Sequence, residues 1–173
     1  MHVYSERGGK TMVRIKEDIE KVMNTYGDMV FKLAFSIIKD YASAEDIAQN
    51  VFIKYMQTEK EIHDLEHQKA WLLRTAINEC KMHLRYYWNA KRVVFPEGWE
   101  IVHNDVVHEE FLLDIVMGLP RKYREAIHLY YYEELSIKEI AVILKKKEAT
   151  VKTHLHRGKQ LLKRRLEEMG YER

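Results

Sequence analysis

Apolar residues recur at steps of three and four along most of this chain, and very little in the sequence interrupts that spacing. The 173 residues include only two Pro and seven Gly. No run alternates apolar and polar residues between turn-forming pairs, which is the pattern of a β-strand. A three- and four-residue period instead places apolar side chains on one face of an α-helix. The sequence therefore predicts an all-α chain.

Three apolar stripes predict three helices of a first bundle. Residues 1–13 show no period, and we expect a flexible tail there, with Met12 as an alternative start to Met1. The first stripe runs from Ile15 to Ile37, and the second follows Ser43, which we expect to be the N-cap of its helix. The third helix is expected from about residue 67 to 89. Its inward residues are expected to be Leu73, Ile77, Cys80 and Leu84.

A change of composition then marks a linker. Residues 93–110 hold Pro96, Gly98 and five acids but no Lys or Arg. Pro, Gly and a change of charge in one segment are typical of a linker between domains. We place the linker at residues 93–107, between a domain over residues 14–92 and another over residues 108–173.

The second domain carries the pattern of a helix-turn-helix. Ser136 and Glu139 have the spacing of a capping box, and a short polar turn leads from that helix into a basic one. Between residues 145 and 165 there are nine Lys or Arg and one acid, an excess that disappears in the whole-chain net charge of +2. The basic helix could simply be solvated, but its place in this motif favours the major groove of DNA. The residues expected to contact DNA there are Lys147, Thr150, Lys152, Thr153, His156, Arg157 and Lys159.

The third helix carries a second candidate nucleic-acid face. Bases and aromatic residues alternate along it, a combination that suits unpaired strands because exposed bases stack on rings while cations follow the phosphates. An Asn amide can pair with the edge of an unstacked base. Packing of the aromatic residues inside the bundle is an equally good reading. The candidate residues are Trp71, Arg74, Asn78, Lys81, Arg85, Tyr86, Tyr87 and Trp88.

Catalytic and metal-binding interpretations have little support. His63 and His67 lack the further ligands of a zinc site, and Cys80 with His83 supplies only two. The sequence contains no glycine-rich phosphate loop or nucleophile elbow. Its apolar runs are far shorter than the roughly 20 residues that a membrane span needs. We therefore expect a cytoplasmic protein with no enzymatic activity, no metal, no cofactor and no membrane insertion.

Four segments, in order, resemble the extracytoplasmic-function sigma factors. Residues 40–52 are similar to "D-x-x-x-A-E-D-[LI]-x-Q-E-x-F", and residues 71–78 to "W-L-x-x-I-A-x-N". Residues 119–124 resemble "L-P-x-x-x-R", and residues 139–155 resemble "E-I-A-x-x-L-G-x-S-x-x-T-V-K-S-R-L". The likeness covers about residues 16 to 166.

The resemblance implies a function for each part of the chain. The first domain would melt the promoter and capture flipped bases of the −10 element, and the second would read the −35 element. Core RNA polymerase would bind through its β′ clamp helices and its β subunit. An anti-sigma factor is a further expected partner, with sequestration at the membrane as one way of holding the chain inactive. The polymerase-binding residues implied are Asp40, Glu45, Asp46, Gln49 and Asn50.

The chain departs from the family pattern at the turn of the helix-turn-helix. Lys145 stands where the family has Gly, and Lys147 stands where it has a Ser N-cap. Losing such a cap typically costs about 1 kcal/mol. Thr153 and His154 replace a Ser-Arg pair, and Asn50 replaces a Glu in the polymerase-binding segment.

Two other functions remain open from the residues alone. One is a self-sufficient helix-turn-helix repressor or activator whose first bundle senses a signal or forms a dimer. The other is a metal-dependent hydrolase that uses the histidines. The first predicts tight duplex binding without polymerase, and the second predicts bound metal.

Overall fold

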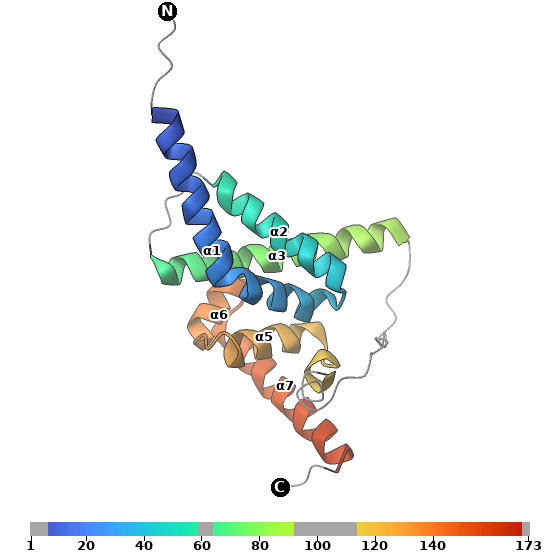
Figure 1. Ribbon diagram of the computed structural model, residues 1–173. Coiled ribbons are helices and arrows are strands. Elements are labelled where there is room, and N and C mark those ends of the chain that lie inside the picture. Colours follow the sequence, from blue (N-terminus) through green and yellow to red (C-terminus); the bar gives the residue numbers. More distant parts are fainter. Residues whose placement is uncertain (1–6, 59–63, 92–113, 171–173) are drawn as a thin grey trace, which may run out of the picture.

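The computed structural model describes residues 7–58, 64–91 and 114–170, of which residues 7–18 and 88–91 are described by their backbone alone. The regular structure over these ranges is helical, as predicted (Figure 1). The helices are α1 (Arg7–Ile38), α2 (Tyr41–Gln57), α3 (Leu65–Lys91), α5 (Arg121–Tyr131), α6 (Ile137–Leu144) and α7 (Glu148–Glu168). A further helical turn at residues 114–117 precedes α5.

Helices α1, α2 and α3 pack against one another as the expected first bundle. The apolar stripes of all three meet in the middle, where each helix contributes side chains that are almost fully buried. The Gln68 amide also donates a hydrogen bond to the Tyr55 hydroxyl, at 2.6 Å, and so joins α3 to α2. The buried residues include Val30, Leu33, Ala34, Ala44, Ile47, Val51, Leu72, Leu73, Ala76, Ile77 and Cys80.

Two expected boundaries in this bundle are wrong. Helix α1 begins at Arg7, inside the segment expected to be a tail, although that segment carries no apolar stripe of its own. The N-cap of α2 is Asp40 and not Ser43, since the Asp40 carboxylate accepts a hydrogen bond from the Ser43 N–H at 2.9 Å. Before it, Lys39 takes a left-handed conformation (φ 64°) that ends α1. The two helices are thus joined by a two-residue turn.

Helices α5, α6 and α7 form the second set. Helix α7 approaches α5 closely at Gly158, where an added Cβ would lie 3.0 Å from Ile127. Arg124 of α5 is 4% exposed, and its guanidinium donates hydrogen bonds to the carbonyl oxygens of Met117 (2.5 Å) and Leu119 (2.8 Å). This buried arginine therefore anchors the segment before α5 to the second set, which gives a structural reason for the arginine of the "L-P-x-x-x-R" pattern.

The helix-turn-helix is present, with one capped start and one uncapped start. At α6, the Ser136 hydroxyl accepts from the Glu139 N–H (3.3 Å), and the Glu139 carboxylate accepts from the Ser136 N–H (2.8 Å), which confirms the capping box. Lys145 adopts the left-handed conformation (φ 53°) that glycine adopts more easily. Lys147, the N-cap of α7, makes no side-chain capping bond.

The two sets of helices lie in direct contact. Helix α1 packs against α5, and α3 packs against α6, so that α5 and α6 lie beside the first bundle while α7 extends away from it (Figure 1). Buried apolar residues of both sets belong to one continuous cluster. The linker expected at residues 93–107 lies outside the described residues, and the proposed domain limits stay a prediction.

Candidate polymerase and nucleic-acid interfaces

The outer face of α2 presents the expected polymerase-binding residues to solvent. Glu45, Asp46, Gln49 and Asn50 are exposed, while Ala44, Ile47 and Val51 fill the core on the opposite side. Asp40 differs from the others, because its carboxylate is already engaged as the cap of the helix. Hydrogen bonding to Ser43 lowers the pKa of Asp40 and keeps it charged.

The candidate face on α3 divides into a partly buried half and an exposed half. Trp71 and Arg74 are partly buried, and the Trp71 ring makes an edge contact with Tyr55, with centroids 5.6 Å apart. Trp71 therefore packs against the bundle, and its contact with DNA stays a prediction. Asn78, Lys81 and Arg85 are exposed one and two turns further on.

The end of α3 carries the most exposed aromatic residue of this face. Tyr86 is 79% exposed, which leaves its ring available for stacking. Tyr87 is partly buried, and the side chain of Trp88 lies outside the described residues. Among the described residues, the Asn78 amide makes no hydrogen bond, so its donor and acceptor groups are available to a ligand. The exposed candidates on α3 therefore combine an amide, two cations and a ring.

The basic face of α7 is exposed along most of its length. Val151, Leu155 and Gly158 point into the second set, and the opposite residues face solvent. Thr150 is an exception among the expected contacts, because it is partly buried. The exposed residues are Lys147, Lys152, Thr153, His156, Arg157 and Lys159.

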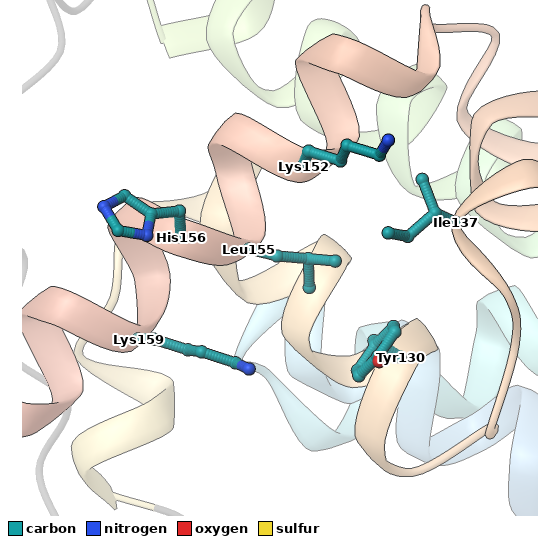
Figure 2. A pocket seen from close by; sticks show the side chains of 6 residues that line it. All are labelled: Tyr130, Ile137, Lys152, Leu155, His156 and Lys159. Carbon is teal, nitrogen blue, oxygen red and sulfur yellow. The ribbon is translucent and has the colours of Figure 1, made fainter.

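A shallow hollow of about 220 Å³ lies beside this face (Figure 2). Tyr130 of α5, Ile137 of α6 and Leu155 of α7 line it together with Lys152, His156 and Lys159. The Lys159 ammonium lies 5.9 Å from the Tyr130 ring centroid and 5.3 Å from that of Tyr131. Sequence reasoning missed these tyrosines, although three successive tyrosines at the end of a helix cannot all point inward.

Two residues of α7, the exposed Arg157 and the partly buried His154, interact with Tyr123 of α5. Arg157 hydrogen-bonds the Tyr123 hydroxyl and lowers the pKa of that phenol. His154 is partly buried and packs edge-on against the Tyr123 ring, with centroids 5.7 Å apart. Burial, and then the charge of Lys146, lower the pKa of His154 and favour its neutral form. His154 thus supports the scaffold beside the exposed residues of α7.

The described ranges contain neither a cluster of metal ligands nor a membrane-spanning helix. No three His, Cys, Asp or Glu side chains there gather closely enough to hold a metal ion. None of the helices in that part of the chain has the length and apolar content to cross a bilayer. His63, one of the histidines considered for a metal site, lies outside the described residues.

Comparison with known proteins shows which family the chain is similar to. Residues 22–90 match the family "Sigma-70 region 2", and residues 112–162 match "Sigma-70, region 4". The ECF RNA polymerase sigma factor SigW of Bacillus subtilis is 32% identical over 86% of this chain and 88% of its own length. SigM of the same organism is 30% identical over 84% of this chain and 93% of its own length.

A solved structure shares the fold. It is the sigma factor RpoE in complex with the anti-sigma factor NepR from Bartonella quintana, with a TM-score of 0.69 and 20% identity. The match covers 91% of this chain and 99% of that one. Taken with the sequence relatives and the two family matches, these likenesses show that the chain belongs to the extracytoplasmic-function sigma factors of the sigma-70 family.

Proposed function

We propose that this sigma factor binds its partners through three separate surfaces. The outer face of α2 binds the β′ clamp helices of core RNA polymerase, while the exposed half of α3 captures unpaired bases of the −10 element. The basic face of α7 reads the −35 element as a duplex, and the β subunit completes the polymerase interface. The observation that carries the proposal is that two separate basic faces, on α3 and α7, are exposed opposite buried apolar faces.

The chemistry of each face suits its assigned nucleic acid. Capture of an unstacked base needs a ring to stack on, an amide to pair with its edge and cations along the strand, which Tyr86, Asn78 and Lys81 supply. Duplex reading needs a helix that enters the major groove with phosphate contacts around it, which suits Lys152 and Arg157 on α7. The chain itself performs no covalent chemistry in this proposal.

The relatives also bear on the alternative functions and partners. A self-sufficient repressor or activator is not favoured, because the curated relatives are sigma factors of RNA polymerase. The structural neighbour is bound to an anti-sigma factor. We infer that a protein of that kind holds this chain inactive as well, and we place the chain in the cytoplasm.

Run-off transcription tests the central claim. Core polymerase with and without this chain is given a library of genomic promoters, and the transcript starts are mapped. The proposal expects starts that depend on the chain and share −10 and −35 sequences. A library in which no start depends on the chain would overturn it.

Asn78→Ala separates base capture from polymerase binding. Loss of a bidentate amide contact costs about 1–3 kcal/mol, so open-complex formation should fall by a factor of about 5 to 150. Binding to core polymerase should stay unchanged, because Asn78 lies on α3 and not on the outer face of α2. Permanganate footprinting reports unpaired thymines, and a pull-down reports polymerase binding. Asn24→Ala, at another exposed Asn, is the matched control. Equal loss in both assays would contradict the assignment.

A further inference from the structure

The last turn of α5 presents a pair of tyrosine rings to one lysine of α7. Tyr130 and Tyr131 are 37% and 49% exposed, and their rings meet edge-on with centroids 4.9 Å apart. The Lys159 ammonium lies 5.3 Å from the Tyr131 centroid and 5.9 Å from the Tyr130 centroid. Both distances are within the range of a cation–π contact. One exposed cation of α7 thus contacts two rings of another helix.

Tyr131 is the nearer of the two rings and also acts through its hydroxyl. Hydrogen bonding to Tyr131, and then electrostatic interaction with it, raise the pKa of Lys159. A lysine without such contacts moves among many rotamers, and binding an anion must order them. The rings therefore reduce the conformational entropy that Lys159 loses when its ammonium binds a ligand.

The same lysine belongs to a row along one edge of α7. Lys152, His156 and Lys159 follow one another at steps of four and three, and all three are exposed. Side chains at this spacing share one side of a helix. The row lies on the side of α7 that faces α5 and α6 (Figure 2). Thr153 and Arg157 stand beside it on the same exposed surface.

A helix that lies in the major groove turns its edges toward the two DNA backbones. The groove is about 12 Å wide and a helix with its side chains is about 10–12 Å across, so the helix fills the groove. Side chains at the centre then reach base edges, while those along an edge reach phosphates. Lys159 lies about three turns after the start of α7 at Glu148, and so beyond the N-terminal residues that contact bases in this motif. Its position favours a phosphate contact.

The hollow beside this edge has the chemistry that suits a DNA backbone. Tyr130, Ile137 and Leu155 give it apolar surface, and the row on α7 gives it two ammonium groups and an imidazole (Figure 2). None of its six lining residues is an acid. A phosphate at the rim would therefore meet cations, while the adjoining sugar would meet apolar side chains.

We propose that Tyr130 and Tyr131 are positioning residues, which hold Lys159 against a backbone phosphate of the −35 duplex at the edge of the major groove. The proposal rests on the proposed function of α7, and it adds two residues of α5 that do not themselves touch DNA. Lys159 supplies the charge, and the rings determine where that charge lies. Because phosphate contacts fix the register of a protein on a duplex, α5 helps to set which bases α7 reads.

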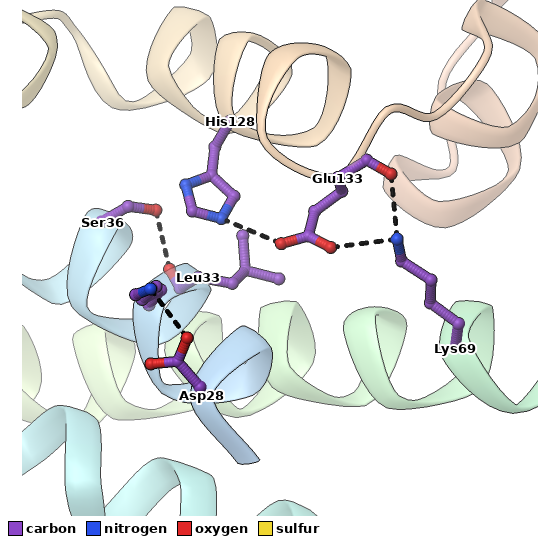
Figure 3. A network of polar contacts seen from close by, with 7 residues as sticks. Asp28, Leu33, Ser36, Lys69, His128 and Glu133 are labelled. Atoms are coloured by element: carbon purple, nitrogen blue, oxygen red, sulfur yellow. Dashed lines mark hydrogen bonds and ion pairs between the residues drawn. The ribbon is translucent and has the colours of Figure 1, made fainter. Parts of the chain in front are cut away.

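Tyr132 provides a matched control in the same segment. Its ring is 52% exposed and stacks on His128, with centroids 5.2 Å apart and planes inclined by 19°. His128 Nε2 lies 3.6 Å from the Glu133 carboxylate, which also forms an ion pair with the Lys69 ammonium of α3 at 3.2 Å (Figure 3). The ring contact of Tyr132 is therefore part of a group that joins α5 to α3, away from Lys159.

A double-mutant cycle tests the positioning role. Core polymerase carrying the full chain is bound to a promoter duplex from the run-off assay, and the affinity is measured over a range of salt concentrations. Lys159→Met should weaken binding and reduce the salt dependence by about one ion. Tyr131→Leu should weaken binding about two- to fivefold and keep the salt dependence, because the lysine charge remains. Added to Lys159→Met, Tyr131→Leu should cause no further loss.

Two conservative changes complete the cycle. Tyr131→Phe keeps the ring over the ammonium and should retain most of the affinity. Tyr132→Leu removes an equally exposed ring that does not contact Lys159, and should bind like the unchanged chain. Both positions are about half exposed, so neither change opens the core.

Methylphosphonate substitution identifies the phosphate. Neutral methylphosphonates replace the phosphates around the −35 element one at a time. One replacement should weaken binding of the unchanged chain and have no effect on Lys159→Met. At the same position, Tyr131→Leu should show a smaller loss than the unchanged chain. A purely structural role of the ring would not single out one phosphate.

The other results overturn the positioning role. A loss in Tyr131→Leu that persists in the Lys159→Met background would mean that the ring contacts DNA itself. Weaker binding of Tyr131→Leu to core polymerase in a pull-down would place the ring in the polymerase interface. Lys159→Met that is sensitive to every phosphate, or Tyr131→Leu that binds like Tyr132→Leu, would exclude the clamp. These results leave the proposed function standing, whereas a chain that forms no promoter complex with core polymerase overturns both.

Discussion

The two candidate DNA-facing helices are held in place by different amounts of buried apolar packing. Helix α3 is held by side chains that are at most 1% exposed, and these lie in a bundle of three long helices (Leu72, Leu73, Ala76, Ile77 and Cys80). Helix α7 is held by Val151, Leu155 and Gly158 against two shorter helices, and it begins without a side-chain cap. The first face is therefore supported by more buried apolar side chains than the second.

This difference predicts where substitutions will be felt. Apolar packing is spread over many contacts, so no single exposed residue of α3 should control its stability. A smaller set of helices buries less apolar surface, so each polar group that closes one of its turns contributes a larger share of its stability. Arg124 and the start of α7 are two such groups, and variants at these positions test the comparison.

Arg124→Ala should have the largest effect. It removes a buried guanidinium that satisfies two carbonyl oxygens before α5, and charged hydrogen bonds of this kind contribute about 1.5–3 kcal/mol each. We expect a loss of about 3 kcal/mol, largest in the second set, with a smaller effect at the end of α1, because the guanidinium also donates to the Ile37 carbonyl oxygen at 3.4 Å. Hydrogen exchange should show faster exchange in α5, α6 and α7 while the amides of α3 keep their protection. Arg164→Ala, at an exposed arginine, is the control. An equal loss of protection in α3 would show that α3 and the second set are not stabilised separately.

Lys147→Ser should stabilise α7 and the second set of helices. A serine at this N-cap can accept a hydrogen bond from an unpaired N–H of α7, so the free energy of unfolding should rise by about 1 kcal/mol. Urea denaturation measures the gain. Lys146→Ser, one residue earlier, cannot cap the helix and should give no gain. If Lys147 contacts a phosphate, the same change should weaken binding to a −35 duplex and reduce the salt dependence by about one ion. A stabilised variant with unchanged duplex binding would remove Lys147 from the interface.

Local patterns in the sequence predicted the parts of the molecule that depend on local physics. The stripes predicted the helices, the Ser136–Glu139 spacing predicted the capping box, and the missing cap at Lys147 was visible before the structure. The exposed residues of α7 follow from the same period, because Val151 and Leu155 must point inward. The cap of α2 was missed because two capping residues, Asp40 and Ser43, compete within one turn. The start of α1 was missed because the segment before Ile15 carries no apolar stripe.

Contacts between distant residues could not be predicted in this way. Arg124, Glu133 and His128 have the charges of surface residues, and no local period indicates that they are buried. Lys69 and Glu133 are 64 residues apart, and only the docking of α3 beside α5 and α6 brings them together. The division of the α3 face into buried and exposed halves has the same cause, since Tyr55 on another helix covers Trp71.

The smallest expected effect is at Lys39, just after α1 and close to Arg124 and Arg165 of the second set. Burial, and then the charges of Arg124 and Arg165, lower the pKa of Lys39 to about 8. A lysine whose pKa is lowered by folding favours its neutral form in the folded state. Its charge therefore destabilises that state fully below about pH 8, and the cost disappears as the pH rises toward the ordinary lysine value near 10.5.

Lys39→Met should raise the free energy of unfolding at pH 7 by about 0.5–1 kcal/mol, a figure reduced because the side chain is partly exposed. The left-handed backbone is equally unfavourable for both residues, so it cancels in the comparison. Thermal melts of Lys39→Met and the unchanged chain from pH 7 to 10 measure the difference, with Lys163→Met at an exposed position as control. The gain should shrink as the pH rises, and a gain that is the same at every pH would mean that the two sets meet without electrostatic strain.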